Sequence, residues 1–144
     1  MSKISGPLID RIDLTVQVDP LNCELLLKQD EDNKINPQSE TSAQIRARVE
    51  AARQIQAQRF NSDCITCNSQ MTPAMVRKYC ILSKDARELL LTAYNHFHFS
   101  ARSNDKILKV ARTIADLDKS NIITSVHISE AIQYNVFERL NRSI

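Results

Sequence analysis

Apolar residues recur at helical spacing over most of the chain beyond residue 40. The clearest case is FSARSNDKILKVARTIADLD, residues 99–118. Its apolar positions follow the i, i+1, i+4, i+7, i+8 pattern of one buried helical face: Ile107, Leu108, Ala111, Ile114 and Ala115. Ser100 precedes them as a good N-cap residue. The pattern predicts a helix that starts at Ser100 and packs on a core.

A second helix is predicted from Thr41 to about Phe60. Thr41 and Gln44 have the spacing of a capping box, in which each side chain bonds the other residue's backbone N–H. The same pattern predicts a buried face that contains Ile45, Val49 and Ala52.

Two further helices are expected before residue 98. Thr72 and Pro73 predict a short helix to Tyr79, because proline at the first helical position loses no hydrogen bond. Ser83 predicts the start of a helix to about Phe97. Its core-facing residues are expected to be Ala86, Leu89, Leu90, Ala93, Tyr94 and Phe97.

The C-terminal part continues in the same way. Ile122 and Ile123 predict a short extended bridge, and Thr124 caps a last helix. The buried side of that helix is expected to hold Ile128, Ala131, Ile132, Val136 and Leu140. Short connections between these segments favour packing between neighbours. The chain is therefore expected to be mainly α, a bundle of four or five helices.

The N-terminal part differs. Residues 13–18 alternate, with Leu14, Val16 and Val18 on one side, which is typical of a half-buried strand. A lone strand has no partner in a helical chain, so it is either part of a larger sheet or pairs with another copy. Residues 21–40 are polar and acidic and predict a linker. This division predicts a strand-bearing segment at 1–20, a linker at 21–40 and a helical domain at 41–144.

Composition excludes several classes of protein. The chain has 144 residues and a formal net charge of +2, too small on its own to indicate nucleic-acid binding. Its single glycine, Gly6, excludes the glycine-rich phosphate loops of nucleotide-binding folds. No apolar run approaches the roughly 20 residues of a membrane span. Four cysteines without a visible signal peptide predict reduced thiols in a cytoplasmic protein.

Cys64 and Cys67 have the Cys-x-x-Cys spacing of half a zinc site. The other half would have to come from Cys23, Cys80, His96 or His98. The sequence has no second Cys-x-x-Cys pair, and two histidines two residues apart on a helix point to different sides. Free thiols and no bound metal are expected.

Several arginines lie where they could bind anions. Those of the 41–60 helix, namely Arg46, Arg48, Arg53 and Arg59, are interpreted as a solvated basic face, a DNA contact or ion-pair partners for another subunit. Arg102 lies in a helical first turn, where the helix dipole disfavours a cation. An anion shared by this guanidinium and the nearby N–H groups would explain its position. Arg112 is expected to pair with Asp116 at i+4.

Four segments together resemble a known family. SGPLIDRIDL, SAQIRARVEAARQIQAQRF, FSARSNDKILKVARTIADLD and HISEAIQY occur in the order found in the C-terminal part of magnesium-chelatase-like AAA+ ATPases. The resemblance is to their ComM (YifB) branch and covers residues 5–134. It implies an AAA+ lid domain preceded by a remnant strand of the AAA+ α/β core. Two positions depart from the branch: Asn104, where an aromatic residue is common, and Asn135, where an arginine is common.

The resemblance also implies roles for two arginines. Arg11 matches the arginine finger that reaches the nucleotide of the next subunit, although it could instead only pair with Asp10 or Asp13. Arg102 matches the sensor-2 arginine of the lid, although it could be merely solvent-exposed. A guanidinium suits either role, because it is permanently charged and binds two phosphate oxygens.

The implied parent protein is an ATPase that uses ATP and Mg²⁺, assembles as a homo-oligomeric ring, with a hexamer expected, and works on DNA. The 144 residues alone carry no Walker A or Walker B motif, so they are not expected to hydrolyse ATP. The alternative interpretations are a free-standing helical DNA-binding module and a protein-interaction module.

Overall fold

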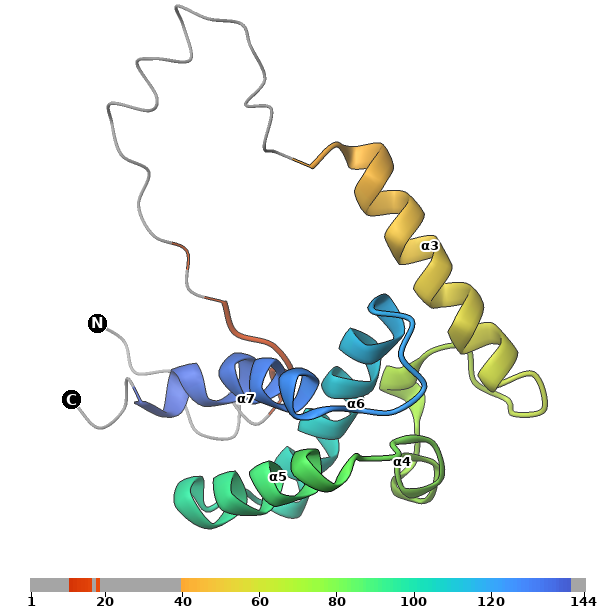
Figure 1. Ribbon diagram of the computed structural model, residues 1–144. Coiled ribbons are helices and arrows are strands. Elements are labelled where there is room, and N and C mark those ends of the chain that lie inside the picture. The colour runs from red at the N-terminus through yellow and green to blue at the C-terminus, as the bar shows by residue number, and fades with distance from the viewer. Residues whose placement is uncertain (1–10, 17, 19–39, 141–144) are drawn as a thin grey trace, which may run out of the picture.

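The computed structural model describes residues 11–16, 18 and 40–140, with the backbone alone for 136–140. Its elements, labelled as in Figure 1, are α3 (Ser42–Arg59), the 3-10 turn η1 (Asn68–Gln70), α4 (Pro73–Tyr79), α5 (Lys84–Phe97), α6 (Ala101–Leu117) and α7 (Ser125–Leu140). The mainly helical fold class is confirmed. No helix among the described residues has both the length and the apolar character needed to cross a membrane.

α6 is the central helix of the bundle. It packs against α3, η1, α4 and α7, while α5 packs against α7 (Figure 1). The predicted stripe of α6 is confirmed, because Ile107, Ala111 and Ala115 are fully buried and Leu108 and Ile114 pack beside them. The other elements contribute these buried apolar residues: Phe60, Met71, Val76, Ala86, Leu90, Ala93, Phe99, Ile123, Ile128 and Ala131.

The predicted helix starts at Thr72, Ser83 and Ser100 are confirmed. Each hydroxyl accepts a hydrogen bond from the backbone N–H three residues later. Tyr94 is an exception to the predicted face of α5, because 41% of it is exposed. The side chains of Val136 and Leu140 lie outside the described residues.

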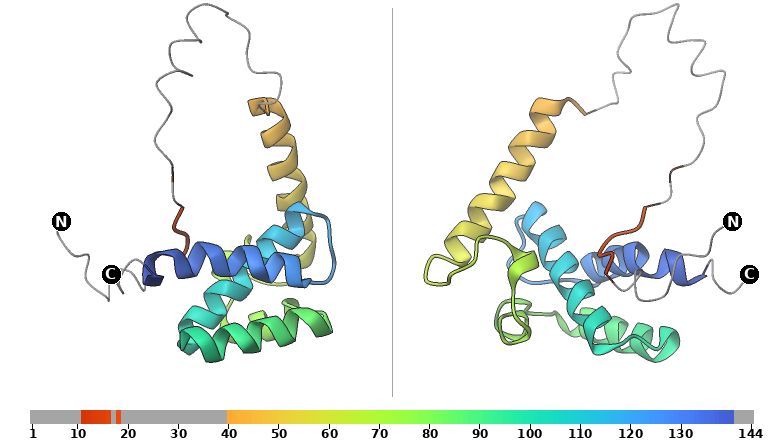
Figure 2. Two further views of the ribbon diagram at one scale, coloured as in Figure 1. Left: turned by 60° about the vertical axis from the view of Figure 1, so that its left-hand side comes forward. Right: turned by 180° about the vertical axis from the view of Figure 1, so that it is seen from behind.

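The first turns of α3 stand apart from the bundle (Figure 2), and the buried residues of this helix are Ala52 and Gln56. The capping box of Thr41 and Gln44 is present as predicted. The predicted buried face is wrong for Ile45 and Val49, which remain 43% and 41% exposed. Of the three predicted residues only Ala52 is buried, and Gln56, which was not predicted, is buried one turn later. The reason is that the bundle ends beside the last turns of α3, so no described element covers the first turns.

The exposed start of α3 gives a first prediction. Thr41→Ala removes the hydroxyl that accepts the Gln44 N–H, which costs about 1 kcal/mol of helix stability. Tertiary packing does not support these turns, so the lost helix stability should appear as faster amide hydrogen exchange at residues 42–50. Exchange in α6 should be unchanged. Unchanged exchange at 42–50 would contradict the prediction. Thr92→Ala, which alters an exposed hydroxyl inside α5, is the matched control.

The junction between α5 and α6 is a sharp turn. His98 ends α5 in the left-handed conformation, with φ 50° and ψ 50°, a conformation that usually selects glycine or asparagine. Phe99 then enters the core, and Ser100 caps α6. This turn fixes where α6 begins and therefore places Arg102.

The predicted extended bridge at Ile122–Ile123 is confirmed. Ile123 pairs in parallel with Leu82, through Ile123 N–H to the Ile81 carbonyl at 2.8 Å and Ser83 N–H to the Ile123 carbonyl at 2.9 Å. The start of α7 is held by His127, whose Nδ1 accepts the Thr124 N–H at 3.1 Å. These bonds connect the beginnings of α5 and α7.

The strand predicted over residues 13–18 does not form in the described part of the segment. Leu14, Val16 and Val18 are all exposed. The segment instead lies on the bundle through Thr15, whose N–H and hydroxyl both donate to the Tyr134 carbonyl, at 3.0 and 2.7 Å. A strand needs a second strand beside it, and the described residues provide none. The predicted linker at 21–40 lies outside the described residues except at residue 40, and the domain boundaries stay a prediction.

Candidate functional site

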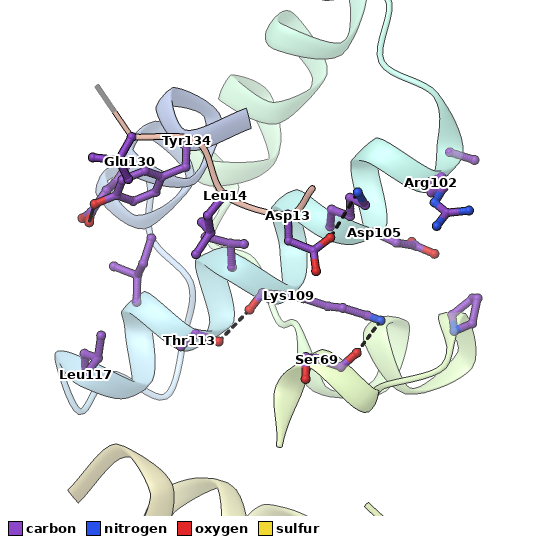
Figure 3. Close-up of a pocket in the computed structure, with 16 residues that line it drawn as sticks. Asp13, Leu14, Ser69, Arg102, Asp105, Lys109, Thr113, Leu117, Glu130 and Tyr134 are labelled. Atoms are coloured by element: carbon purple, nitrogen blue, oxygen red, sulfur yellow. Dashed lines mark hydrogen bonds and ion pairs between the residues drawn. The ribbon is translucent and has the colours of Figure 1, made fainter. Parts of the chain in front are cut away.

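A groove runs along α6 between the N-terminal segment, α7 and the turn around η1 (Figure 3). Its volume is about 980 Å³. Its walls are mainly apolar and include Leu14, Val110, Ile114 and Leu117. Charged side chains also line the groove: Asp13, Arg102, Asp105, Lys106, Lys109 and Glu130. Apolar walls with a few charged groups are typical of ligand and partner sites.

Arg102 lies at the N-terminal end of this groove, and Leu117 lies at the other end (Figure 3). Arg102 occupies the first turn of α6, which contains no acidic residue. The Arg102 side chain is exposed. Among the described residues it forms no hydrogen bond or ion pair. Arg102 is therefore a cation beside the N–H groups of a helix start, a combination that can bind an anion but gains nothing from the helix itself.

Lys106, one helical turn after Arg102, joins the N-terminal segment to α6. Its Nζ donates to the Ile12 carbonyl at 3.0 Å and pairs with Asp13 at 3.1 Å. Arg11 is exposed and does not line the groove. The two predicted site residues thus both lie near Lys106, with Arg11 next to Ile12 and Arg102 four residues before Lys106. The alternative for Arg11 was a pair with Asp10 or Asp13. Asp13 pairs with Lys106, and Asp10 lies outside the described residues.

The sequence interpretation missed Lys106 and Lys109 as groove residues. Their spacing was an available signal, because residues 102, 106, 109 and 113 recur on one face of a helix. Lys109 Nζ donates to the Ser69 carbonyl at 3.0 Å, so this lysine also holds η1 against α6 (Figure 3). Tyr134 at the other wall donates its hydroxyl to Glu130 at 3.1 Å, a bond that raises the pKa of the tyrosine.

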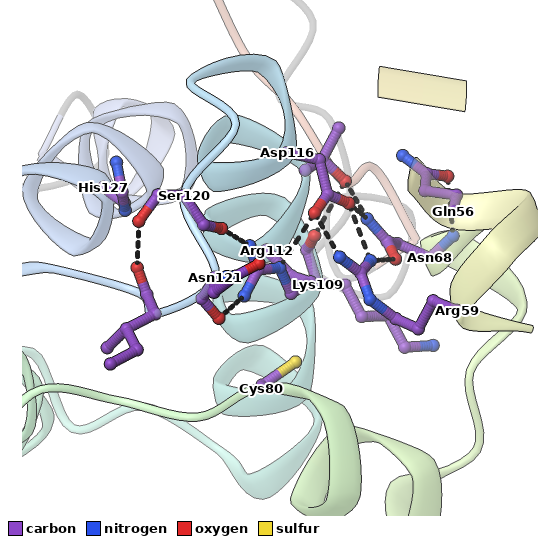
Figure 4. Close-up of polar contacts among 12 residues, drawn as sticks. Gln56, Arg59, Asn68, Cys80, Lys109, Arg112, Asp116, Ser120, Asn121 and His127 are labelled. Atoms are coloured by element: carbon purple, nitrogen blue, oxygen red, sulfur yellow. Dashed lines mark hydrogen bonds and ion pairs between the residues drawn. The ribbon is translucent and has the colours of Figure 1, made fainter. Parts of the chain in front are cut away.

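Beside the groove, a buried polar network joins α3, η1 and α6 (Figure 4). Its centre is Asp116, whose side chain is completely buried. Arg59 binds this carboxylate with both terminal nitrogens, one of them at 2.7 Å from Oδ2. Asn68 Nδ2 donates to the same Oδ2 at 2.8 Å, and Arg112 Nε to Oδ1 at 3.1 Å. One carboxylate therefore faces two guanidinium groups and an amide.

The network continues on both sides of Asp116. Arg112, 1% exposed, donates to the carbonyls of Ser120 and Asn121, the latter at 2.9 Å. Burial lowers the pKa of Arg112 from its ordinary value, and Asp116 opposes that shift. Asn68 receives a hydrogen bond from Arg59 at 2.9 Å, and its N–H donates to Gln56 at 3.2 Å. The predicted Arg112–Asp116 pair is confirmed, and its role is structural.

The arginines of α3 have different environments. Arg59 belongs to the buried network, so it is not part of a solvated basic face or a DNA contact. Arg48 pairs with Glu40 through two bonds, at 2.6 and 2.9 Å, and both residues are exposed. Arg46 and Arg53 are exposed. Of these four arginines, only Arg59 is withdrawn from the surface of α3, and the charge of Arg48 is offset by exposed Glu40.

Cys64 and Cys67 lie in the loop between α3 and η1, and both are free thiols. Within the described part of the chain, no group of three His, Cys, Asp or Glu side chains could hold a metal ion. Cys23, one of the expected candidates for a second half-site, lies outside that part.

Comparison with known proteins identifies the family to which the chain is similar. Residues 39–135 match the family described as "Magnesium chelatase, subunit ChlI C-terminal". The chain is 36% identical over 140 residues to the uncharacterized protein YifB of Escherichia coli and 34% identical over 140 residues to the competence protein ComM of Haemophilus influenzae. Each alignment covers 97% of this chain and 26% of the relative. An uncharacterized Mycobacterium bovis protein is 33% identical over 117 residues, 81% of this chain and 22% of the relative.

The chain thus spans about a quarter of the length of the curated relatives it matches. The matched region, residues 39–135, contains α3 to α6, most of α7, Arg102 and the buried network. Three of the four segments that suggested the resemblance lie inside the family match, and the first, at residues 5–14, lies within the alignments to YifB and ComM. The chain belongs to the magnesium chelatase ChlI C-terminal family, as a relative of ComM and YifB.

Proposed function

We propose that this chain is the lid region of a ComM-type ring ATPase and that Arg102 contacts the phosphates of ATP. The observation that carries the proposal is the position of Arg102, an exposed cation in the first turn of α6 with no partner among the described residues. No described residue neutralises its charge, whereas a bound triphosphate would supply the negative charge that the helix start lacks.

The groove fits an anion better than a metal ion. Two of the three carboxylates that line it are engaged, because Asp13 pairs with Lys106 and Glu130 accepts the hydroxyl of Tyr134. The third, Asp105, would be a single ligand, and the described residues contain no group of three that could hold a metal ion. Arg102 would bind the triphosphate, and Mg²⁺ would enter with the nucleotide on residues outside these 144. The Mg²⁺ ion neutralises charge that develops on the transferred phosphoryl group.

The proposal includes a role for Arg11 toward a neighbouring subunit. Arg11 is exposed on a segment that Lys106 holds against α6. From there it could reach a nucleotide bound by another copy in a homo-oligomeric ring, which we propose to be a hexamer. A guanidinium in that position stabilises the charge of the transition state. DNA as the substrate of the ring, and a cytoplasmic location consistent with free thiols, belong to the same proposal by family analogy.

A graft tests the proposal. In the graft, this chain replaces the 140 matching residues of Escherichia coli YifB. We expect the graft to hydrolyse ATP in the presence of Mg²⁺, and YifB truncated before this region not to do so. Duplex and single-stranded DNA are added separately, and stimulation of the rate is expected if DNA is the substrate.

Two measurements make a negative result interpretable. Circular dichroism reports whether the grafted region is helical, and light scattering reports whether the graft assembles like YifB. A helical, assembled graft that binds ATP but does not hydrolyse it, beside an active YifB, would overturn the proposed role. ATP hydrolysis by the truncated protein would do the same.

The alternative of a free-standing DNA-binding module makes a different prediction. Neutralising phosphates with arginines releases counterions, so binding by the chain alone would weaken steeply with salt. Only Arg46 and Arg53 of the α3 arginines are exposed and outside the ion pairs of Arg48 and Arg59. That small charge favours the lid proposal over this alternative.

A further inference from the structure

We propose that Cys67, assisted by Cys64, is a site of thiol–disulfide exchange with small disulfides of the glutathione class. The inference does not rest on the proposed ATPase role. It starts from two accessible thiols with Cys-x-x-Cys spacing in one loop, Cys64 exposed and Cys67 partly exposed. A pair with this spacing can form a mixed disulfide at one cysteine and resolve it with the other.

The loop that carries the pair is held on several sides. Asp63 accepts the hydroxyl of Tyr79 at 2.6 Å, and Thr66 N–H donates to the side chain of Gln70 at 2.8 Å. The Ser69 carbonyl accepts Lys109 at 3.0 Å, and Asn68 is buried in the Asp116 network. The two thiols are therefore presented from a fixed loop, so their reactivities should differ reproducibly.

Cys67 is the thiol whose surroundings stabilise the thiolate form. Its Sγ lies 3.1 Å from the Ser69 hydroxyl, and a thiolate can only accept, so the hydroxyl would donate to it. This bond lowers the pKa of Cys67; partial burial opposes it, and the backbone N–H groups of Gln70 and Ser69 and the Thr66 hydroxyl add to the lowering. Three charged groups bind the loop beside Cys67: Arg59 and Asp116 contact the Asn68 side chain at 2.9 and 2.8 Å, and Lys109 contacts the Ser69 carbonyl at 3.0 Å.

Cys80 provides an internal contrast. It is 8% exposed in the core, and its thiol donates to the Leu108 carbonyl at 3.6 Å. Burial is the main cause that raises the pKa of this thiol, to about 11. The thiolate is the reactive form, so Cys80 should stay unmodified while Cys67 reacts.

The exchange has two balanced steps. The Cys67 thiolate attacks one sulfur of glutathione disulfide, whose S–S bond breaks, and one glutathione leaves as a thiolate. The Cys64 thiolate then attacks the Cys67 sulfur, and the second glutathione leaves. The two cysteines are oxidised to an internal disulfide, and one glutathione disulfide is reduced to two glutathione thiols.

The test uses the whole chain with Cys23→Ser, so that the cysteine outside the described residues cannot react. The chain is treated with glutathione disulfide at neutral pH, quenched with acid and analysed by mass spectrometry with peptide mapping. We expect a Cys64–Cys67 disulfide with no added glutathione and an unmodified Cys80. With Cys64→Ser added, one glutathione should accumulate on Cys67, several-fold faster than Cys64 reacts when Cys67→Ser is added instead.

Ser69→Ala is the specific control, because it removes the hydroxyl while the Ser69 carbonyl that binds Lys109 remains. In the Cys64→Ser background, this change should raise the pH midpoint for reaction of Cys67 and slow the reaction at neutral pH. Equal rates at Cys64 and Cys67, or two glutathiones retained on the oxidised chain, would overturn the proposal. An unchanged pH midpoint in Ser69→Ala would show that the serine does not activate the thiol. Circular dichroism of every variant confirms that the helices persist.

Discussion

Replacing Asp116 with alanine is expected to lower the free energy of unfolding by about 3–5 kcal/mol, because removing one partner leaves buried charge uncompensated. With Asp116 present, the Arg112 side chain is 1% exposed and the Arg59 side chain 14% exposed, so both charges lie away from water. Their two positive charges would then face each other without the carboxylate. Asn68 would also lose an acceptor for its amide. Urea unfolding followed by circular dichroism measures the change.

The exposed pair of Glu40 and Arg48 is the matched control. Its geometry is also bidentate, but about half of each side chain is exposed. Exposed pairs contribute little, so Glu40→Ala should leave the urea midpoint nearly unchanged. The effect of Asp116→Ala should also persist at high salt, because buried charges are screened less. If Asp116→Ala does not fold at all, Asp116→Asn supplies the measurable variant. An unfolding midpoint equal to that of the original chain in either variant would contradict the structural role.

The signals that predicted helix starts at four N-cap residues were local, and they were correct. Thr41, Thr72, Ser83 and Ser100 each bond an N–H three residues away, so the few residues around them contain the necessary information. The stripe of α6 was also correct, because both its spacing and its burial follow from one amphipathic helix. Local pattern therefore predicted most of the secondary structure.

The environment of a residue could not be predicted when distant segments create it. Asn68 lies between the helices predicted at 41–60 and 72–79, and its partners Gln56, Thr113 and Asp116 lie 12, 45 and 48 residues away. Arg59 was interpreted with the surface arginines of α3, although Asp116, 57 residues further on, draws it into the core. Nothing near either residue in the sequence indicates burial.

Ile45 and Val49 show the opposite error. Their spacing is correct for a buried face, but a periodic pattern states only which side of a helix is apolar. Whether another element covers that side depends on where the bundle ends. The alternation at residues 13–18 is limited in the same way. An apolar face on an extended segment predicts that the segment pairs and packs in a sheet, but it does not identify the segment that provides the neighbouring strand.

For the candidate site, the sequence and the resemblance identified Arg102 and Arg11, and the position of Arg102 on the groove was not foreseen. The groove forms where residues 13–16 cross α6 and α7, which lie at least 85 residues further along the chain. Lys106 makes the connection through the Ile12 carbonyl and Asp13. The roles of the two arginines toward ATP stay predictions.

Arg11→Ala in the graft with YifB is expected to lower kcat for ATP hydrolysis by about 10³–10⁵-fold, which is the rate enhancement that an arginine finger typically provides. If Arg11 acts on a neighbour's nucleotide, Arg11→Ala subunits can still bind ATP themselves. Mixing them with subunits that cannot bind ATP but keep Arg11 should therefore restore part of the activity. Wild-type turnover in Arg11→Ala would remove the residue from the mechanism, and no recovery in mixed rings would exclude action across subunits.

Arg102→Ala in the same graft is expected to lower kcat by about 10²–10³-fold, as for the loss of one positioned donor to transition-state charge. Arg102→Lys should recover only part of the activity, because a lysine keeps the charge but lacks the planar, two-pronged geometry. The matched control is Arg87→Ala, which removes an exposed arginine from α5 away from the groove lining and should change kcat little. Because Arg102 is exposed and unpartnered among the described residues, its removal should leave the urea midpoint of the chain unchanged. A lower midpoint with normal turnover would make Arg102 a structural residue, whereas lost turnover with an unchanged midpoint is the result that only a contact with the nucleotide explains.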